Sequence, residues 1–292
     1  MTEPWLTVKQ GDTALLVSFP HTGLSVPAEC AAALVSFPLA RHDADRHIDK
    51  LYAFATELGG TTVHTALSRT VIDVNRDPSG ASLYPGQTTT GLVPTETFDG
   101  RALYRDGQAP TPDEIERRKA LYFAPYQRAL AGEIKRLRAL HPRVVLYDCH
   151  SIRSVEPRLF SGELPVFNIG TNSGKSCDSA LEAAVAHRCA ASPWSHVVNG
   201  RFTGGWITRT YGRPAEGVHA VQMELAMRGY LPNEKDPPPW DPISPNRSSR
   251  HCAPCSKTAS PLHEGDALVS RFRSSHHCAA RSFANFGIKK GH

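Results

Sequence analysis

The sequence lacks the segments that would place a protein in or across a membrane. It contains no uninterrupted apolar run of about 18 residues, so we expect no transmembrane helix. Residues 1–5 lack the basic start and apolar core of a signal peptide. The seven cysteines are odd in number and scattered, which argues against a disulfide framework. We therefore expect a cytoplasmic protein without membrane contacts.

The chain also has little excess charge outside its last residues. Its net charge is +5, but residues 242–292 hold eight Lys or Arg against Glu264 and Asp266. The other 241 residues hold 25 basic and 26 acidic side chains. Because the basic character belongs to the terminal segment, it is no sign that the body binds nucleic acid. We expect no nucleic-acid partner.

Four apolar runs each deliver a polar residue at or near their carboxyl end. They are residues 14–19 before His21, residues 71–72 before Asn75 and Arg76, residues 144–147 before His150, and the strand 218–224, which has Glu224 near its end. Such runs are typical of buried parallel strands, and ligands of open α/β sheets bind beyond the carboxyl ends of the strands. The pattern predicts one α/β domain with a shared site at one sheet edge.

The polar residues at these ends suit a catalytic metal. Such a centre takes three N or O ligands and leaves one position for water. His21, Asp45 and His150 supply a set, with Asp43 as the alternative acid, although either Asp can instead cap the helix expected after residue 47 and His21 can sit in a plain surface turn. Glu224 is the candidate for the carboxylate that takes a proton from the water.

Arginines near the same ends suit an anionic substrate. Asn75 and Arg76 can hold a carboxylate, unless Arg76 pairs only with a neighbouring Asp. The Gly-rich stretch 199–212 adds Arg201 and Arg209 as substrate-binding candidates, and Arg153 is a candidate for stabilising an oxyanion. Together these residues predict a metal-dependent amide hydrolase for a small acidic substrate.

Two other readings of the same residues are open. A cysteine hydrolase using Cys149 and His150 is geometrically awkward, because adjacent residues of a strand point to opposite faces. A non-enzymatic, carboxylate-binding protein with structural histidines, or an inactive one, is the second alternative. Such a protein would not need Glu224 at the end of a fourth strand.

Other segments are expected to frame this site. A helix is predicted from Thr111, as its cap, to Leu140, with a kink at Pro125. The Gly-, Pro- and Thr-rich residues 77–112 are expected to form a rim or lid, because loops of this length are usually functional or mobile. Strands near residues 61–67, 70–74 and 165–170 and a helix over 178–189 complete the expected elements.

The composition changes after residue 241. Residues 242–292 are rich in Ser, Arg, His, Cys and Pro and show no helical or strand period. We expect a domain over residues 1–241 followed by an atypical tail, disordered, unrelated to the body or read in a shifted frame. A zinc knuckle built on Cys252 and Cys255 is an alternative, although only one CxxC is present and the spacing fits no known finger.

Several blocks of the chain, in order, resemble the N-formylglutamate amidohydrolase (N-formylglutamate deformylase) family over roughly residues 10–240. They are Ser18–Gly23 (SFPHTG), 43–48 (DADRHI), 68–69 (SR) with 73–76 (DVNR), 83–84 (LY), 89–92 (TTGL), 98–101 (FDGR), 148–154 (DCHSIRS), 199–202 (NGRF) and 219–225 (HAVQMEL). Two departures stand out: Trp206 occupies a position where a polar residue is expected, and the tail lacks an apolar closing helix.

The resemblance implies hydrolysis of N-formyl-L-glutamate to glutamate and formate, a step of histidine degradation, or hydrolysis of another N-acyl acidic amino acid. It implies a three-layer α/β domain with a mixed, mostly parallel sheet, similar to zinc carboxypeptidases and zinc-dependent amidases. It also implies a divalent metal held by His21, Asp45 and His150. Zinc is favoured for these ligands, while manganese or cobalt would also fit.

Overall fold

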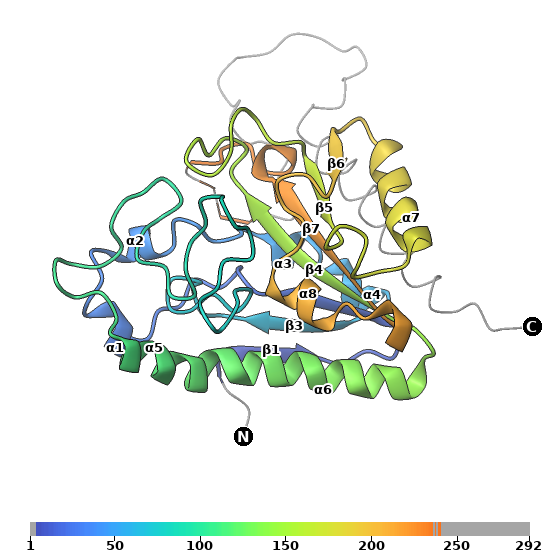
Figure 1. Cartoon of the computed structure of the whole chain (residues 1–292), viewed down its shortest axis with the longest axis horizontal. Helices are drawn as coiled ribbons and strands as arrows, with labels where there is room; N and C mark the ends of the chain where they lie inside the picture. The colour runs from blue at the N-terminus through green and yellow to red at the C-terminus, as the bar shows by residue number, and fades with distance from the viewer. Residues whose placement is uncertain (1–3, 236, 238, 241–292) are drawn as a thin grey trace, which may run out of the picture.

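Seven strands form one mixed sheet in the computed structural model, which describes residues 4–235, 237 and 239–240 (Figure 1). The strands are β1 (Leu6–Lys9), β2 (Leu15–Phe19), β3 (Thr61–Thr65), β4 (Val144–Ile152), β5 (Phe167–Gly170), β6 (His196–Val198) and β7 (Val218–Ala226). Their order across the sheet is β1-β3-β2-β4-β7-β5-β6. The α/β fold predicted from the apolar runs is confirmed.

The centre of the sheet is parallel and is flanked on each side by an antiparallel pairing, beyond which β6 pairs parallel with β5 at one edge. Strands β3, β2, β4 and β7 run parallel, whereas β1 pairs antiparallel with β3 and β5 antiparallel with β7. All nine residues of β4 and of β7 are buried. Because both faces of these central strands are covered, they appear in the sequence as continuous apolar runs instead of alternating ones.

Helices cover both faces of the sheet and give the domain three layers. They are α1 (Ala28–Ala31), α2 (Phe37–Ala40), α3 (Ile48–Leu51), α4 (Phe54–Glu57), α5 (Pro112–Arg118), α6 (Ala124–Leu140), α7 (Ser179–Ala190) and α8 (Trp206–Tyr211), with a π-helix (Lys119–Phe123) and 3₁₀ turns (Pro214–Glu216 and Met227–Gly229). Val145 and Tyr147 pack with α3, α4 and α7, whereas Val144 and Leu146 pack with α6 and α8. Alternate residues of β4 therefore feed two separate cores.

The long helix begins where the sequence predicts and changes its hydrogen-bond pattern before Pro125. The Thr111 side chain accepts a hydrogen bond from Glu114 N, and Pro112 occupies the first turn of α5. The α-helical pattern gives way to the π-helix immediately before Pro125, whose nitrogen has no hydrogen to donate. The helical pattern is thus interrupted just before Pro125, and a kink at Pro125 stays a prediction.

The expected strand over residues 70–74 is wrong. These residues form turns, in which Asp73 N donates to Leu92 O and the Asp73 side chain accepts from Asn75 N. Local side-chain bonds of this kind compete with pairing into a sheet. The strand before them, β3, ends at Thr65, so Asn75 and Arg76 reach the sheet edge from a loop.

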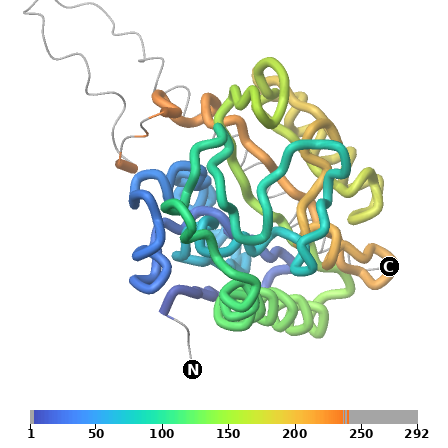
Figure 2. The backbone as a smooth tube through the Cα atoms, turned by 60° about the vertical axis from the view of Figure 1, so that its left-hand side comes forward, coloured from blue at the N-terminus to red at the C-terminus, as the bar shows by residue number. Residues whose placement is uncertain are grey.

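The loop that follows crosses the end of the sheet from which these residues project. Figure 2 shows residues 77–110, in blue-green, running across the front of the molecule. After this loop the chain enters α5, which lies beside the sheet (Figure 1). Among the described residues, no helix combines the length and the apolar composition needed to cross a bilayer. The tail and the zinc-knuckle alternative lie outside the described residues.

Candidate active site

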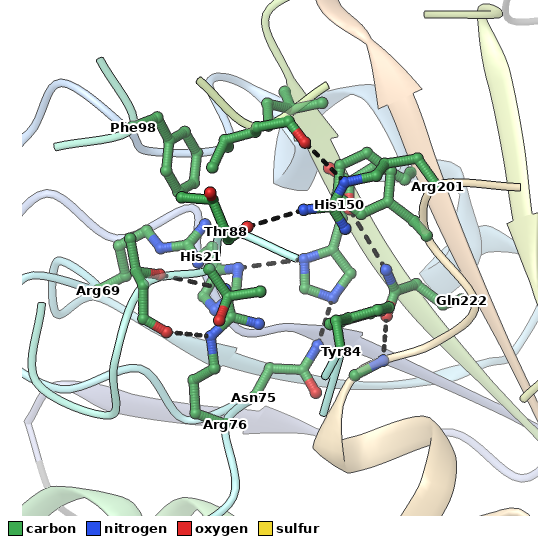
Figure 3. A pocket seen from close by; sticks show the side chains of 17 residues that line it. His21, Arg69, Asn75, Arg76, Tyr84, Thr88, Phe98, His150, Arg201 and Gln222 are labelled. Atoms are coloured by element: carbon green, nitrogen blue, oxygen red, sulfur yellow. Dashed lines mark hydrogen bonds between the residues drawn. The ribbon is translucent and has the colours of Figure 1, made fainter. Parts of the chain in front are cut away.

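A pocket opens at the carboxyl ends of β2, β4 and β7, under the loop of residues 77–110. Its empty space, part of which is open to solvent, is about 530 Å³. Its lining comprises His21, Arg69, Asn75, Arg76, Tyr84, Thr88, Thr89, Thr90, Phe98, His150, Ile152, Leu159, Arg201, Phe202, Gly205, Gln222 and Glu224 (Figure 3). The expected rim thus contributes Tyr84, Thr88 to Thr90 and Phe98.

Three of the predicted ligand residues meet at the floor of this pocket. His21, Asp45 and His150 are buried, and one ligand atom from each lies within 4.8 Å of the others. His150 Nδ1 lies 3.0 Å from Asp45 Oδ2 and 3.1 Å from His21 Nδ1. His21 follows β2, His150 belongs to β4, and Asp45 precedes α3, so the paired strands bring distant parts of the chain together.

Two further carboxylates fix the outer faces of the two imidazoles. Asp73 Oδ1 accepts from His21 Nε2 at 2.6 Å, and Asp148 Oδ2 accepts from His150 Nε2 at 2.9 Å. In the neutral tautomer with Nε2 protonated, which a bound metal would require, each ring presents the lone pair of Nδ1 toward Asp45. Histidines that bind metals are usually oriented by a carboxylate in this way.

The inner side of this cluster fits a divalent cation. Two nitrogen lone pairs and a carboxylate converge there, and the second carboxylate oxygen, Asp45 Oδ1, is buried without a hydrogen-bond partner. Burial opposes the charge of His150, yet Asp148 and Asp45 raise its pKa well above the usual value. Burial likewise opposes ionisation of Asp45, but His150 and His21 lower its pKa. The surroundings therefore favour positive charge at this point.

Glu224 faces the cluster from the adjacent strand. Its backbone lies directly opposite that of His150 in the parallel pairing of β4 and β7. The side chain is buried at the pocket wall, and its Oε2 accepts a hydrogen bond of 3.3 Å from Gln222 Nε2. Burial raises the pKa of this carboxyl to about 8. A carboxyl with a pKa near neutrality is suited to take up and release a proton.

The structure separates Asp43 from Asp45. Asp43 lies outside the cluster: its Oδ1 accepts from Arg153 Nη2 at 2.8 Å and its Oδ2 from Phe98 N at 2.7 Å. Neither Asp caps the following helix, because His47 occupies the N-cap position of α3, with φ 61°. Asp45 is consequently the acid that belongs with the histidines.

Arg153, the candidate for the oxyanion, is not among the residues that line the pocket. Its guanidinium donates to Glu156, to Asp43 Oδ1 and, at 3.0 Å, to His42 O. The Arg153 guanidinium is therefore already hydrogen-bonded to protein acceptors through Nε, Nη1 and Nη2. Arg153 therefore joins the end of β4 to the loop that carries Asp45.

Asn75 and Arg76 have different surroundings. Asn75 Nδ2 lies 3.0 Å from Asp148 Oδ2 and 2.9 Å from His150 Nε2, while its Oδ1 accepts from Ile207 N at 2.8 Å. Its amide is thus committed to the protein and positions His150. Arg76 lines the pocket, and its Nε lies 3.5 Å from Asp73 Oδ2. Of this pair, Arg76 is the one placed to meet an anion.

Arg201 and Arg209 also differ in their access to the pocket. Arg201 lines it, and its buried Nη1 has no hydrogen-bond partner. Arg209 is not a lining residue, because it donates to Gly204 O at 2.8 Å and to Thr203 Oγ1 at 3.1 Å. Arg209 stands behind Tyr84, with its guanidinium carbon 5.2 Å from the ring centroid.

Sequence reasoning missed several residues of the site. Asp148 and Gln222 stand two positions before His150 and Glu224, and the two-residue period of a strand, which puts such pairs on one face, was the signal for them. Arg69 also lines the pocket: it donates to Asp73 Oδ2 at 2.6 Å, and its buried Nε has no hydrogen-bond partner. No periodicity marked Arg69, because it lies in a turn.

Comparison with known proteins places this geometry in a family. The sequence model of N-formylglutamate amidohydrolase matches residues 13–231, which include every site residue described above. The chain belongs to the N-formylglutamate amidohydrolase family. It is 49% identical over 227 residues to an N-formylglutamate deformylase of Pseudomonas aeruginosa, a match covering 77% of this chain and 85% of that protein. An N-formylglutamate deformylase of Pseudomonas putida is 45% identical over the same shares of the two chains.

Solved structures agree with the fold of this amidohydrolase-family chain. The crystal structure of N-formylglutamate amidohydrolase from Ralstonia eutropha superposes with a TM-score of 0.72 at 22% identity, over 97% of each chain. A gene product from Agrobacterium tumefaciens superposes with a TM-score of 0.64 at 16% identity, over 95% of each chain. At these identities the superpositions speak for the fold alone.

Proposed function

We propose that this protein is a metal-dependent amidohydrolase that cleaves the formamide bond of N-formyl-L-glutamate, releasing L-glutamate and formate, as a step of histidine degradation. The observation that carries the proposal is the meeting of His21, Asp45 and His150 beside Glu224, in a pocket that three arginines line. The curated relatives bear the name of this activity. The cytoplasmic location and the kinship with zinc carboxypeptidases stay predictions.

The buried cluster supplies the metal ligands in this proposal. His21 Nδ1, His150 Nδ1 and the Asp45 carboxylate would hold a divalent cation, with zinc favoured by the nitrogen and oxygen donors. When bound, the cation lowers the pKa of a water molecule and polarises the formyl carbonyl. Asp73 and Asp148 hold the two imidazoles in the tautomer that leaves both Nδ1 atoms free to bind.

The protein's own groups then handle the substrate and the proton. Arg76 and Arg201 attract the two carboxylates of the substrate into the pocket. Glu224 removes a proton from the attacking water, whose oxygen bonds to the formyl carbon. Glu224 then delivers that proton to the amide nitrogen, so that the C–N bond breaks and the amine leaves. Arg69, with its unpaired Nε, is placed to stabilise negative charge that develops on the carbonyl oxygen.

The direct test follows formate and glutamate release from N-formyl-L-glutamate by the purified protein, with and without a chelator, together with the metal content. We expect chelator-sensitive release and about one metal per chain. His150→Ala should abolish both, and N-acetyl-L-glutamate, assayed in parallel, tests the alternative acyl group. A folded protein that binds no metal and releases nothing from either compound would refute the proposal.

A further inference from the structure

Arg201 is a pocket-lining arginine that keeps an unused donor and, unlike Arg69 and Arg76, forms no ion pair with a described carboxylate. Its Nε donates to Leu159 O and its Nη2 to Thr88 O, both at 2.9 Å. Its buried Nη1 has no hydrogen-bond partner, and no described carboxylate forms an ion pair with the guanidinium. Arg201 is partly buried, and burying its Nη1 without a partner or counter-ion is costly unless a ligand supplies an acceptor of opposite charge.

Two aromatic rings pack against the Arg201 guanidinium and hold it in place. The Arg201 guanidinium carbon lies 5.4 Å from the centroid of the Tyr84 ring and 5.1 Å from that of Phe202. Arg209 lies 5.2 Å from the same Tyr84 ring. The Tyr84 hydroxyl donates to Gly204 O at 3.0 Å, which is also the acceptor for Arg209 Nε. Tyr84 and Arg209 thus fix the direction of Arg201 before any ligand arrives.

The backbone before Arg201 is fixed as well. Asn199 has φ 52°, a left-handed conformation that Asn tolerates better than most residues. Its Oδ1 accepts from Thr171 N at 2.9 Å, and its Nδ2 donates to Thr171 Oγ1 at 2.8 Å. After this turn, residues 202–204 pass close to Gly170 at the end of β5. The stretch 199–201 is therefore built to present one arginine.

Arg201 and Arg76 occupy different parts of the pocket. Figure 3 shows them on opposite sides of the His21 and His150 rings. Arg76 is tied to Asp73, the carboxylate that bonds His21, so it lies beside the ligand cluster. Arg201 donates to the backbone of Leu159 and lies over the Phe202 ring, and both of these apolar residues also line the pocket. Burial, together with the charge of Arg76, lowers the pKa of Arg201.

The chemistry of an N-formyl dicarboxylic amino acid matches this division. Its formamide nitrogen and its α-carboxylate are attached to one carbon, so the α-carboxylate stays close to the reacting carbonyl. The side-chain carboxylate lies farther away, at the end of methylene groups that need an apolar wall. Arg76 suits the nearer carboxylate, and Arg201, with Phe202 and Leu159, suits the farther one.

We propose that Arg201 binds the side-chain carboxylate of the substrate and sets the preference for an acidic side chain, with Tyr84 and Arg209 as its positioning residues. This inference rests on the proposed formamide hydrolysis. It gives Arg209, for which substrate contact was expected from the sequence, an indirect role.

The test compares kcat and KM for N-formyl-L-glutamate and N-formyl-L-glutamine, whose side chains have the same shape but differ in charge. The wild type should prefer the glutamate compound by about 100-fold, because an unpaired buried cation rejects the neutral amide. Arg201→Met should lose that preference through a higher KM for the glutamate compound, with the glutamine compound little affected. Arg158→Met, which removes an arginine paired with Glu96 on the rim, is the matched control and should keep the preference.

Four further variants make the outcome decisive. Arg201→Lys keeps the positive charge but loses the bidentate guanidinium, so it should retain part of the preference for the glutamate compound. This variant also provides a test if Arg201→Met does not fold. Tyr84→Phe and Arg209→Met should raise KM for the glutamate compound with kcat unchanged, and Arg209→Lys should restore part of the loss. Equal losses on both compounds in Arg201→Met, or a wild type that uses both equally, would overturn the inference. A wild type that hydrolyses neither compound would instead overturn the proposed function on which it rests.

Discussion

The imidazoles of His21 and His150 face each other through Nδ1 atoms that are 3.1 Å apart. Their outer Nε2 atoms are bonded to Asp73 and Asp148. Two nitrogen lone pairs so close repel one another unless a proton or a cation lies between them, and the Asp45 carboxylate adds negative charge at the same point. The outer carboxylates thus orient the inner atoms toward a point where a cation would relieve this repulsion.

Replacing Asp148 by Asn should weaken metal binding without removing a ligand. The amide cannot hold the Nε2 proton of His150 as a carboxylate does, so the ring loses its fixed tautomer and part of its basicity. We expect a 10- to 100-fold loss of affinity, which is about the usual cost of losing such an outer partner. Competition for zinc against a chromophoric chelator measures it.

Asp178→Asn is the matched control for Asp148→Asn. Asp178 pairs with Arg143 at 3.2 Å near the opposite ends of the strands, far from the carboxyl ends that carry the pocket. Its replacement should leave the zinc affinity unchanged. Equal affinities in the two variants would contradict the role given to Asp148.

The parts of the site that the sequence predicts best are those carried by strands. His150 and Glu224 end continuous apolar runs, and parallel pairing of β4 and β7 places them side by side. The position of His21 follows in the same way from β2, which pairs parallel with β4. A strand fixes the direction of its side chains, so a pattern along the chain translates directly into a position in space.

The loop residues could not be placed from the sequence. Asp43 and Asp45 are the same residue type two positions apart, so the sequence does not say which one joins the histidines. The contacts of Arg153 with Asp43 and of His150 with Asp45 decide it. Arg201 and Arg209 also occur in one Gly-rich stretch, yet only Arg201 lines the pocket. In loops, the direction of a side chain depends on partners that are distant in sequence, and a single sequence does not reveal them.

Arg153→Met should disturb the metal site from a distance. Arg153 joins β4 to His42 O and Asp43, two residues before Asp45, and its loss leaves the buried Asp43 and Glu156 without their cation. Breaking a buried ion pair costs about 3–5 kcal/mol, so the free energy of unfolding should fall by an amount of this order. Denaturant unfolding and zinc competition together measure both effects.

Arg153→Lys should restore part of the stability lost in Arg153→Met, since the charge remains. Arg158→Met is again the control, because that side chain is exposed at the rim. If Arg153→Met bound zinc as tightly as the wild type, Arg153 would have no part in placing Asp45. Its predicted contact with an oxyanion would then need a direct kinetic test.

Ending the chain after Asp241 should change neither stability nor activity. The family match ends at residue 231, and the buried cores extend to Leu231, with Trp240 packed against one of them. The expected domain over residues 1–241 contains all the residues of the site. Thermal unfolding and turnover of the shortened and full-length proteins provide the comparison, and a lower Tm after shortening would assign residues 242–292 a structural role.

Glu224→Gln should abolish turnover while stabilising the metal-free protein at alkaline pH. Removing the proton-transferring carboxylate should cost about 10²- to 10⁴-fold in kcat. Burial raises the pKa of this carboxyl from 4.5 to about 8. Between these two values the folded protein binds more protons than the unfolded chain, so the wild type loses stability as pH rises through this range. Gln does not titrate, and the loss should disappear.

Thermal unfolding of chelator-treated wild type and Glu224→Gln between pH 5 and pH 8 measures this difference. The Tm of the variant should exceed that of the wild type by a growing margin toward pH 8, since one pKa unit corresponds to about 1.4 kcal/mol. Glu57→Gln, which changes an exposed carboxyl in α4, should instead follow the wild type. The wild type and Glu224→Gln differ only in a carboxyl and its amide. Parallel curves of Tm against pH for the two proteins would therefore mean that Glu224 is not held in a buried, protonated state. Its role as the proton carrier would then lose its physical basis.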